Sequence, residues 1–356
     1  MNPQIITIAG KAYDASAFFE EAPTLLGTSD FARQLFIFLK DWFSDSPVLS
    51  VCTSGSTGIP QEMLVQKTRM MQSARLTCAF LGLKPGDTAL LCMPLEYIAG
   101  KMMVVRALVA GLDLHFVTPC GHPLAQQAGP FTFAAMVPMQ VYDSMGNETE
   151  KSRVMAIKHL IIGGGAIDQA MEQTLQKFPN HVYSTYGMTE TLSHIAMRKL
   201  NGPDASPRYI PFSGVHLSLG ADNALVIDAP LVAQERIYTK DIAHIAQDGS
   251  FKIIGRKDNV INSGGIKIQA EEVEALLKPV ISGTFAISSA PDAKFGEIVV
   301  LVTEEKVDQQ LIHQALPKYY VPRKILQVDQ IPLTGTQKLD RAGLKKQVLQ
   351  ILSAQA

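Results

Sequence analysis

The feature that most constrains this fold is a regular alternation of two sequence patterns between residues 48 and 187. Short apolar runs bounded by turn residues alternate there with longer segments of helical periodicity. The strand-like runs are 48–52, 88–93, 114–117, 159–164 and 181–187, and the helix-like segments are 67–82, 98–111 and 167–178. Alternation of this kind predicts a parallel or mixed α/β sheet, preceded here by a helical stretch over 15–45.

The pattern changes twice towards the C-terminus. From about residue 214, short alternating strands (VHLSL, ALVID, RIYTK, AHIAQ and FKIIG) predict a β-rich meander. Beyond residue 256 charged side chains become denser, and the order β-α-β-β-α, with helices at 270–277 and 308–316, predicts a small α+β unit. We therefore predict a large α/β domain with a β-rich subdomain over 1–257 and a small, mobile α+β domain over 258–356.

Charge and cysteine usage narrow the class of protein. A formal net charge of −1 gives no extended field for nucleic acid or an anionic membrane. The four cysteines form no CxxC pair, and the N-terminal residues show neither a signal peptide nor a span for a bilayer. We expect a cytoplasmic protein with reduced thiols.

A loop rich in hydroxyls and glycine follows the strand-like run 48–52. It reads Thr53, Ser54, Gly55, Ser56, Thr57, Gly58. Backbone N–H groups and hydroxyls can cradle phosphate oxygens, and the loop lacks the Gly-Lys-Ser/Thr ending of a Walker A motif. A polar surface turn is the alternative. Its position after a buried strand favours a ligand loop, because α/β sheets bind ligands at the carboxyl ends of strands.

Further candidate positions follow the next strand-like runs. The run 181–187 ends in the motif Tyr186-Gly187-Met188-Thr189-Glu190-Thr191, where Glu190 could ligate Mg²⁺, or Thr189 could simply cap a helix. After 159–164, Gly164, Gly165 and Ala166 could lie against a planar ring or form a tight turn.

The C-terminal part carries three more candidate groups. Asp241 and Arg256 could together bind a ribose, while Gly264 and Gly265 permit a hinge or a narrow passage. Lys338 lies on a Gly/Thr-rich loop, where a solvated lysine is the ordinary interpretation.

In this order, TSGSTGIP, YGMTET, GRKDNVINSGGIKI and LTGTQKLDR resemble the superfamily of acyl-CoA synthetases, peptide-synthetase adenylation domains and luciferases. The resemblance spans roughly residues 48–341 and implies ATP, Mg²⁺ and coenzyme A as ligands. It implies that residues 53–58 grip the phosphates, that the positions from Gly164 to Ala166 and Tyr186 frame adenine, and that Asp241 and Arg256 bind ribose.

The same resemblance implies the catalytic residues. Thr189 would contact the α-phosphate, Glu190 would hold Mg²⁺, and Lys338 would bridge the attacking carboxylate and the leaving oxygen. Asp258 would be the hinge of the small domain, and the Gly264–Gly265 strand would line a tunnel for coenzyme A.

The sequence departs from the superfamily pattern at several positions. The phosphate loop ends in Gln61 where the superfamily has lysine, and Lys67 is the candidate to replace that lysine. Lys240 and Gln337 stand where glycine is usual. Only about 50 residues precede the phosphate loop, so an N-terminal subdomain is expected to be abbreviated, and a homodimer could cover the exposed surface.

The segment 93–111 resembles the acyl-pocket helix of the o-succinylbenzoate–CoA ligase family of menaquinone biosynthesis. That resemblance assigns Arg106 and Ser193 to the substrate's carboxylates, with Lys101 on the same helix and Tyr97 where these ligases often have histidine. A dicarboxylate needs a cation for its non-reacting carboxylate, although Arg106 could instead extend to solvent.

We therefore expect an ATP-dependent, AMP-forming CoA ligase that converts 2-succinylbenzoate to its CoA thioester through an acyl-adenylate. The alternatives are a ligase for another aromatic or short-chain acid, a stand-alone adenylation module that loads a carrier protein, and a degenerate binding relative.

Overall fold

The computed structural model describes residues 5–25, 29–52, 62–127, 129–165, 167, 169–334 and 339–354. The described residues form two compact units. The first comprises Met1–Leu217, Ile227–Ile237 and Ala246–Phe251, and the second Ser218–Val226, Tyr238–Ile245 and Lys252–Ala356. The predicted domain boundary between residues 257 and 258 stays a prediction.

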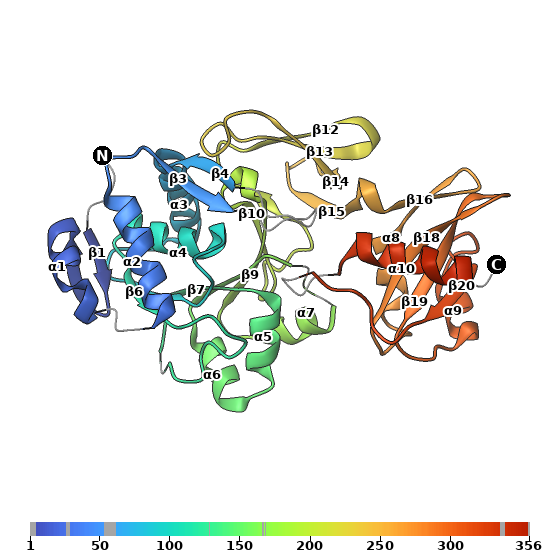
Figure 1. Cartoon of the computed structure of the whole chain (residues 1–356), viewed down its shortest axis with the longest axis horizontal. Helices are drawn as coiled ribbons and strands as arrows, with labels where there is room; N and C mark the ends of the chain where they lie inside the picture. The colour runs from blue at the N-terminus through green and yellow to red at the C-terminus, as the bar shows by residue number, and fades with distance from the viewer. Residues whose placement is uncertain are drawn as a thin grey trace. The chain divides into compact units, whose positions relative to one another are not determined.

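A large mixed sheet is the frame of the first unit (Figure 1). Among the described residues its strands are β1 (Ile5–Ile8), β2 (Lys11–Asp14), β5 (Thr88–Leu91), β6 (Asp113–Phe116), β7 (Phe133–Met136), β8 (His159–Ile162), β9 (His181–Gly187), β10 (His194–Lys199) and β11 (Ile210–Pro211). The spatial order is β11-β10-β9-β8-β7-β5-β6-β1-β2. The pairs from β1 through β6, β5, β7 and β8 to β9 are parallel, and the flanking β2, β10 and β11 run antiparallel to their neighbours.

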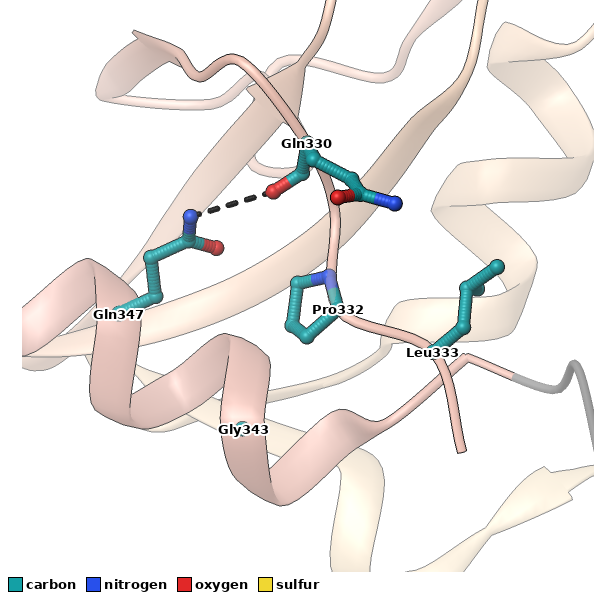
Figure 2. Close-up of a pocket in the computed structure, with 5 residues that line it drawn as sticks. All are labelled: Gln330, Pro332, Leu333, Gly343 and Gln347. Carbon is teal, nitrogen blue, oxygen red and sulfur yellow. Dashed lines mark hydrogen bonds between the residues drawn. The ribbon is translucent and has the colours of Figure 1, made fainter. Parts of the chain in front are cut away.

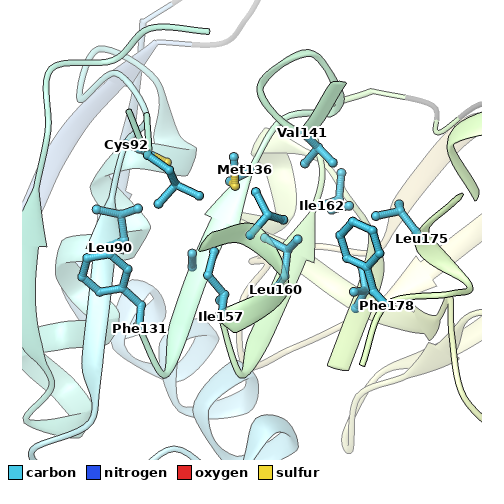
Figure 3. Close-up of a cluster of buried hydrophobic side chains, with 14 of the residues drawn as sticks. Leu90, Cys92, Phe131, Met136, Val141, Ile157, Leu160, Ile162, Leu175 and Phe178 are labelled. Atoms are coloured by element: carbon cyan, nitrogen blue, oxygen red, sulfur yellow. The ribbon is translucent and has the colours of Figure 1, made fainter. Parts of the chain in front are cut away.

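The helices of the first unit are α1 (Ala15–Leu25), α2 (Asp30–Phe43), α3 (Lys67–Leu81), α4 (Ile98–Ala110), α5 (Pro138–Met145), α6 (Glu148–Ala156) and α7 (Gln169–Leu175). Alternate residues of β5, β7, β8 and β9 pack against α5, α6 and α7 in one buried cluster (Figure 3). Because side chains of a strand alternate between faces, the remaining apolar residues of these strands face the other side, and α4 contacts β1, β5 and β6. The predicted α/β architecture is confirmed.

The strand-like run 48–52 is β3 (Val48–Cys52), but its place in the sheet was predicted wrongly. It pairs antiparallel with β4 (Glu62–Gln66) in a sheet of its own rather than joining the central sheet. The reason is that the chain reverses between these strands, so the nearest partner is the following segment. The prediction missed β4 because polar residues flank its short apolar core.

The second unit contains a sheet of order β17-β16-β19-β18 with β20 parallel to β19. Its strands are β16 (Val260–Ser263), β17 (Ile266–Gln269), β18 (Phe285–Asp292), β19 (Gly296–Thr303) and β20 (Lys324–Gln327). Its helices are α8 (Ala270–Leu277), α9 (Gln309–Ala315) and α10 (Arg341–Ala354). Helices α8 and α9 pack on one face of this sheet and α10 packs on the other, so the sheet separates two small cores.

The predicted meander is a sheet of order β12-β13-β14-β15, with strands β12 (His216–Leu219), β13 (Ala224–Asp228), β14 (Ile237–Ile245) and β15 (Phe251–Arg256). RIYTK and AHIAQ, predicted as separate strands, belong to the single strand β14, because no turn residue interrupts them. None of the helices in the described parts of the chain combines the length and apolarity that crossing a membrane requires.

Candidate active site

The parallel strands β7, β8 and β9 end at one edge of the central sheet, and the predicted nucleotide residues of this unit follow them. The N–H of Gly163 donates to the carbonyl of Met136 at 3.1 Å, which carries the β7–β8 pairing one residue past the strands. Gly164 then adopts φ +79°, a conformation that favours glycine. A Cβ on Gly165 would lie 3.4 Å from the Pro138 ring, so this turn packs against the first residue of α5. Ala166 lies outside the described residues.

The turn after β9 is held by the Thr191 hydroxyl. Its Oγ1 accepts from the N–H of Met188 at 3.1 Å and lies 2.7 Å from the carbonyl oxygen of Ser193. Thr189 and Glu190 begin the single 3₁₀ turn that results, Thr189 half-buried and the Glu190 carboxylate exposed. The alternative of Thr189 as a helix cap is wrong, because Met188 occupies the cap position.

Gly187 is required where β10 approaches β9. A Cβ at this position would lie 2.4 Å from both the Cα of His194 and the carbonyl oxygen of Ser193. The β9–β10 register also shifts between residues 194 and 196. This irregularity places Ser193 and His194 beside the end of β9.

Tyr186 belongs to an aromatic group that the sequence did not predict. Its ring centroid lies 5.2 Å from Phe251 in an edge-to-face arrangement and 5.9 Å from Tyr209. Phe251 and Tyr209 are joined by two backbone hydrogen bonds of 2.7 and 2.9 Å. The ring that the resemblance assigns to adenine is therefore fixed by packing. Because Tyr209 and Phe251 are far from residue 186 in sequence, only pairing between distant segments could have identified them.

The most unusual group in the first unit is the guanidinium of Arg106 on α4, which is only 2% exposed. Nη2 donates to Ser193 Oγ at 2.6 Å, and Nη1 lies 3.7 Å from Met103 Sδ. Nε is buried without a hydrogen-bond partner, and no carboxylate among the described residues forms an ion pair with this side chain. Burial lowers the pKa of Arg106 to about 10, so it stays charged at neutral pH. The alternative of an arginine reaching solvent is wrong.

The neighbouring predicted residues take different positions. Lys101 Nζ donates to the carbonyl of Ser50 at 2.8 Å, which ties α4 to the middle of β3. Tyr97 caps the start of α4 with its backbone and is half-buried. Arg106 and Ser193 are therefore brought together, whereas Lys101 is occupied with the strand that leads to residues 53–58.

Three predicted residues of the second unit form one charged group. Arg256 Nη1 donates to Asp241 Oδ1 at 2.9 Å, and Nη2 lies 3.8 Å from Asp258 Oδ2. Asp258 also pairs with Lys240 at 3.1 Å. The residue that replaces the usual glycine thus contacts the predicted hinge. Asp241 is 8% exposed, and its N–H donates to Thr239 Oγ1.

Gly264 and Gly265 form the turn between β16 and β17, with φ +61° and +84°. The N–H of Gly264 donates to the carbonyl of Phe295 at 2.8 Å, and the Phe295 ring carries the Arg323 guanidinium 3.8 Å from its centroid. Both glycines are needed where they stand, because side chains rarely adopt this conformation.

The base of the loop that carries Lys338 is ordered by a bridge between Leu333 and Leu339 and by a 2.9 Å hydrogen bond from Asp340 N–H to the Pro332 carbonyl. A hollow of about 440 Å³ lies beside it, lined by Gln330, Pro332, Leu333, Gly343 and Gln347 (Figure 2). None of these five lining residues carries a charge. Lys338 itself and residues 53–58 lie outside the described residues.

Lys67, the alternative to the missing loop lysine, is completely buried. Its Nζ donates to the carbonyls of Trp42 and Ser44, each at 2.8 Å, at the C-terminal end of α2. Burial lowers its pKa, and the helix carbonyls satisfy its charge. These contacts favour a structural role for Lys67.

Comparison with known proteins gives consistent results. Residues 31–229 match the family described as AMP-binding enzyme. A 2-succinylbenzoate–CoA ligase of Bacillus cereus (strain Q1) is 24% identical over 352 residues, covering 87% of this chain and 72% of that protein.

Two solved structures show the same fold. An acyl-CoA synthetase (AMP-forming)/AMP-acid ligase II-like protein from Dyadobacter fermentans is 32% identical, with a TM-score of 0.64 over 90% of this chain and 95% of that one. The o-succinylbenzoate coenzyme A synthetase of Bacillus subtilis, in complex with ATP and magnesium ion, is 21% identical, with a TM-score of 0.68 over 83% and 69%. With the family match extending over more than half of its length, this chain belongs to the AMP-binding enzyme family.

Proposed function

We propose that this chain is an ATP-dependent, AMP-forming carboxylate–CoA ligase and that its acid is 2-succinylbenzoate. Membership of the AMP-binding enzyme family supports the reaction class. The similarity to ligases named for 2-succinylbenzoate supports the acid. The observation that carries the proposal is the buried guanidinium of Arg106.

An arginine that is 2% exposed and has no carboxylate partner among the described residues calls for an anion. Ser193 alone offers a neutral oxygen, and Nε has no acceptor. A monocarboxylic acid that reacts at its only carboxylate would leave this cation uncompensated. A dicarboxylate supplies the missing charge with the group that does not react, and Arg106 binds it as a planar donor.

The predicted residues divide the chemistry as follows. The acid's carboxylate attacks the α-phosphorus and releases pyrophosphate, after which the thiol of coenzyme A attacks the acyl-adenylate and releases AMP. Negative charge develops on phosphoryl oxygens in the first step, and Lys338 and Thr189 are proposed to stabilise it.

A magnesium ion fits the residues at the end of β9. Mg²⁺ prefers few carboxylates together with substrate phosphates, and Glu190 presents an exposed carboxylate there. Glu190 would hold the ion together with the substrate phosphates. When bound, the ion would neutralise phosphate charge during pyrophosphate departure.

The ribose and coenzyme A assignments rest on the second unit. Arg256 holds Asp241 in place, and we propose that the Asp241 carboxylate accepts from a ribose hydroxyl. Gly264 and Gly265 present backbone without side chains, as a narrow pantetheine passage would require. Cytoplasmic location and a homodimer remain parts of this proposal. The thiols of Cys78, Cys92 and Cys120, all free, agree with a reducing compartment.

The test is product identification. The purified protein is incubated with ATP, Mg²⁺, coenzyme A and one acid at a time: 2-succinylbenzoate, benzoate, acetate or octanoate. AMP and the thioester are then measured by mass spectrometry. We expect AMP and thioester together, with 2-succinylbenzoate alone. A thioester formed equally well from a monocarboxylic acid would contradict the substrate, and AMP without thioester would indicate an adenylation module that loads a carrier protein.

A further inference from the structure

His194 lies next to Ser193 and is almost as buried as Arg106, with 8% of its surface exposed. Nδ1 lies 3.2 Å from Ser193 Oγ, and Nε2 lies 2.9 Å from Thr77 Oγ1 on α3. The ring also packs edge-to-face against Phe212 at 5.5 Å. Both nitrogens are therefore engaged, one towards the arginine and one away from it.

The hydrogen bonds of this group have one consistent direction. The Ser73 carbonyl, 3.3 Å from Thr77 Oγ1, can accept the proton of this hydroxyl, which allows Nε2–H of His194 to donate to Thr77 at 2.9 Å. In a neutral imidazole Nδ1 is then an acceptor, and it takes the Ser193 hydroxyl proton. The Ser193 oxygen keeps its lone pairs for the 2.6 Å bond from Arg106.

The charge state agrees with this direction. Burial lowers the pKa of His194 well below its ordinary value, and the Arg106 cation lowers it further. Protonation of Nδ1 would remove the acceptor for Ser193 and place two cations side by side. The ring therefore stays neutral at physiological pH.

We infer that His194 is a positioning residue for the acid site: through Nδ1 it fixes the Ser193 hydroxyl, which holds the Arg106 guanidinium for the substrate's second carboxylate. The inference rests on the proposed function for the identity of the ligand. It assigns Ser193 the role of an acceptor that orients the arginine rather than that of a donor to the acid.

The sequence did not single out His194, because a lone histidine in an apolar strand is usually a core residue. The structure adds that its two nitrogens connect α3 to α4 through Ser193. If Ser193 were displaced, the planar guanidinium of Arg106 would turn away from the substrate's second carboxylate. Binding of that carboxylate would weaken, while binding of ATP would not change.

Two isosteric variants separate the nitrogens. In His194→Asn the side-chain oxygen can occupy the place of Nδ1 and accept from Ser193, whereas in His194→Gln the amide nitrogen can reach Thr77 but leaves Ser193 without its acceptor. For each variant, three quantities are measured: the KM for the dicarboxylic acid, the KM for ATP and the thermal midpoint of unfolding.

We expect His194→Gln to raise the KM for the dicarboxylate by about 10-fold, the upper end of what loss of one neutral hydrogen bond gives. His194→Asn should restore it to within about threefold of the wild type, because it supplies the same acceptor. Both should leave the KM for ATP unchanged. Equal effects of the two variants on the dicarboxylate, or parallel losses for acid and ATP, would overturn the inference.

A readout independent of turnover keeps this test apart from that of the proposed function. In ¹⁵N-histidine-labelled protein, the resonances that disappear in His194→Asn belong to residue 194, and they should report the neutral tautomer with its proton on Nε2. A proton on Nδ1 would refute the inference even in an active enzyme. If the wild type ligates no acid, the proposed function fails while the tautomer still decides the role of His194.

Discussion

Replacing Arg106 by methionine should lower activity without lowering stability. The buried charge destabilises the folded state, whereas it is needed to bind the substrate's second carboxylate. Methionine has a similar length and fills the same space between α4 and Ser193. Truncating one partner of a buried, hydrogen-bonded charge pair costs about 2–5 kcal/mol of binding, or roughly 30-fold to several thousand-fold. We therefore expect kcat/KM with the dicarboxylic acid to fall within that range.

The effect on stability should have the opposite sign. Burial lowers the pKa of Arg106 from its ordinary value to about 10, and this difference corresponds to about 3 kcal/mol against the charged form in the folded state. Below pH 10 folded and unfolded chains both carry the proton, so the folded state bears the full cost. The cost declines only as pH rises above about 10 towards the ordinary pKa of arginine. Losing the bond to Ser193 offsets part of the gain, worth about 1.5–3 kcal/mol.

The assay compares two monocarboxylic analogues, 4-oxo-4-phenylbutanoate and 2-butanoylbenzoate, each of which lacks one carboxylate of the substrate. The wild type should have a higher kcat/KM for the dicarboxylate than for either analogue that it accepts. In Arg106→Met the ratio of the two kcat/KM values should fall to about one. The midpoint of thermal unfolding should not drop below that of the wild type. A preserved preference, or a strongly destabilised variant, would refute the reasoning.

Three other substitutions test separate parts of the site. Lys338→Ala should abolish pyrophosphate release yet leave thioester formation from supplied acyl-adenylate largely intact, whereas equal loss of both steps would remove its proposed role. Gly187→Ala should lower stability by about 1–3 kcal/mol in chemical denaturation and weaken use of the acid, because its Cβ would meet the backbone of β10 at 2.4 Å; unchanged stability would contradict the described β9–β10 approach. Lys67→Met should destabilise the protein by about 1–3 kcal/mol, since it leaves two carbonyls of α2 without their donor, while the KM for ATP stays constant; a raised KM for ATP at a temperature where the variant is folded would instead make Lys67 the replacement for the loop lysine.

Local patterns predicted the frame of the fold well. The alternation of apolar runs and helical segments located β5, β6, β8 and β9 and the helices α4 and α7, because each is decided by residues within one window, whereas α5 and α6 were missed. The pairing of β3 with β4 was not predicted, and β4, β7 and β10 were not recognised as strands. Their pairing depends on how the chain reverses and on the close approach at Gly187, which no single window contains.

The candidate site divides in the same way. Arg106 stood out in the sequence as a charge within an apolar helix, and a resemblance indicated Ser193. Their contact joins positions 87 residues apart and required the structure. No local pattern selects His194 or Thr77. In the sequence, a histidine or threonine of this hydrogen-bonded chain cannot be told from an ordinary core histidine or helix threonine. Of the two interpretations of Arg106, the structure excludes the one that has it reaching solvent.

The central claim is that an acid is activated as its adenylate, and oxygen transfer tests it most directly. The protein is given 2-succinylbenzoate with ¹⁸O in both carboxylates, together with ATP, Mg²⁺ and coenzyme A, and the released AMP is analysed by mass spectrometry. Attack of the carboxylate on the α-phosphorus predicts one ¹⁸O atom in each AMP for each thioester formed. AMP without the label, or formation of ADP in place of AMP, would contradict the account.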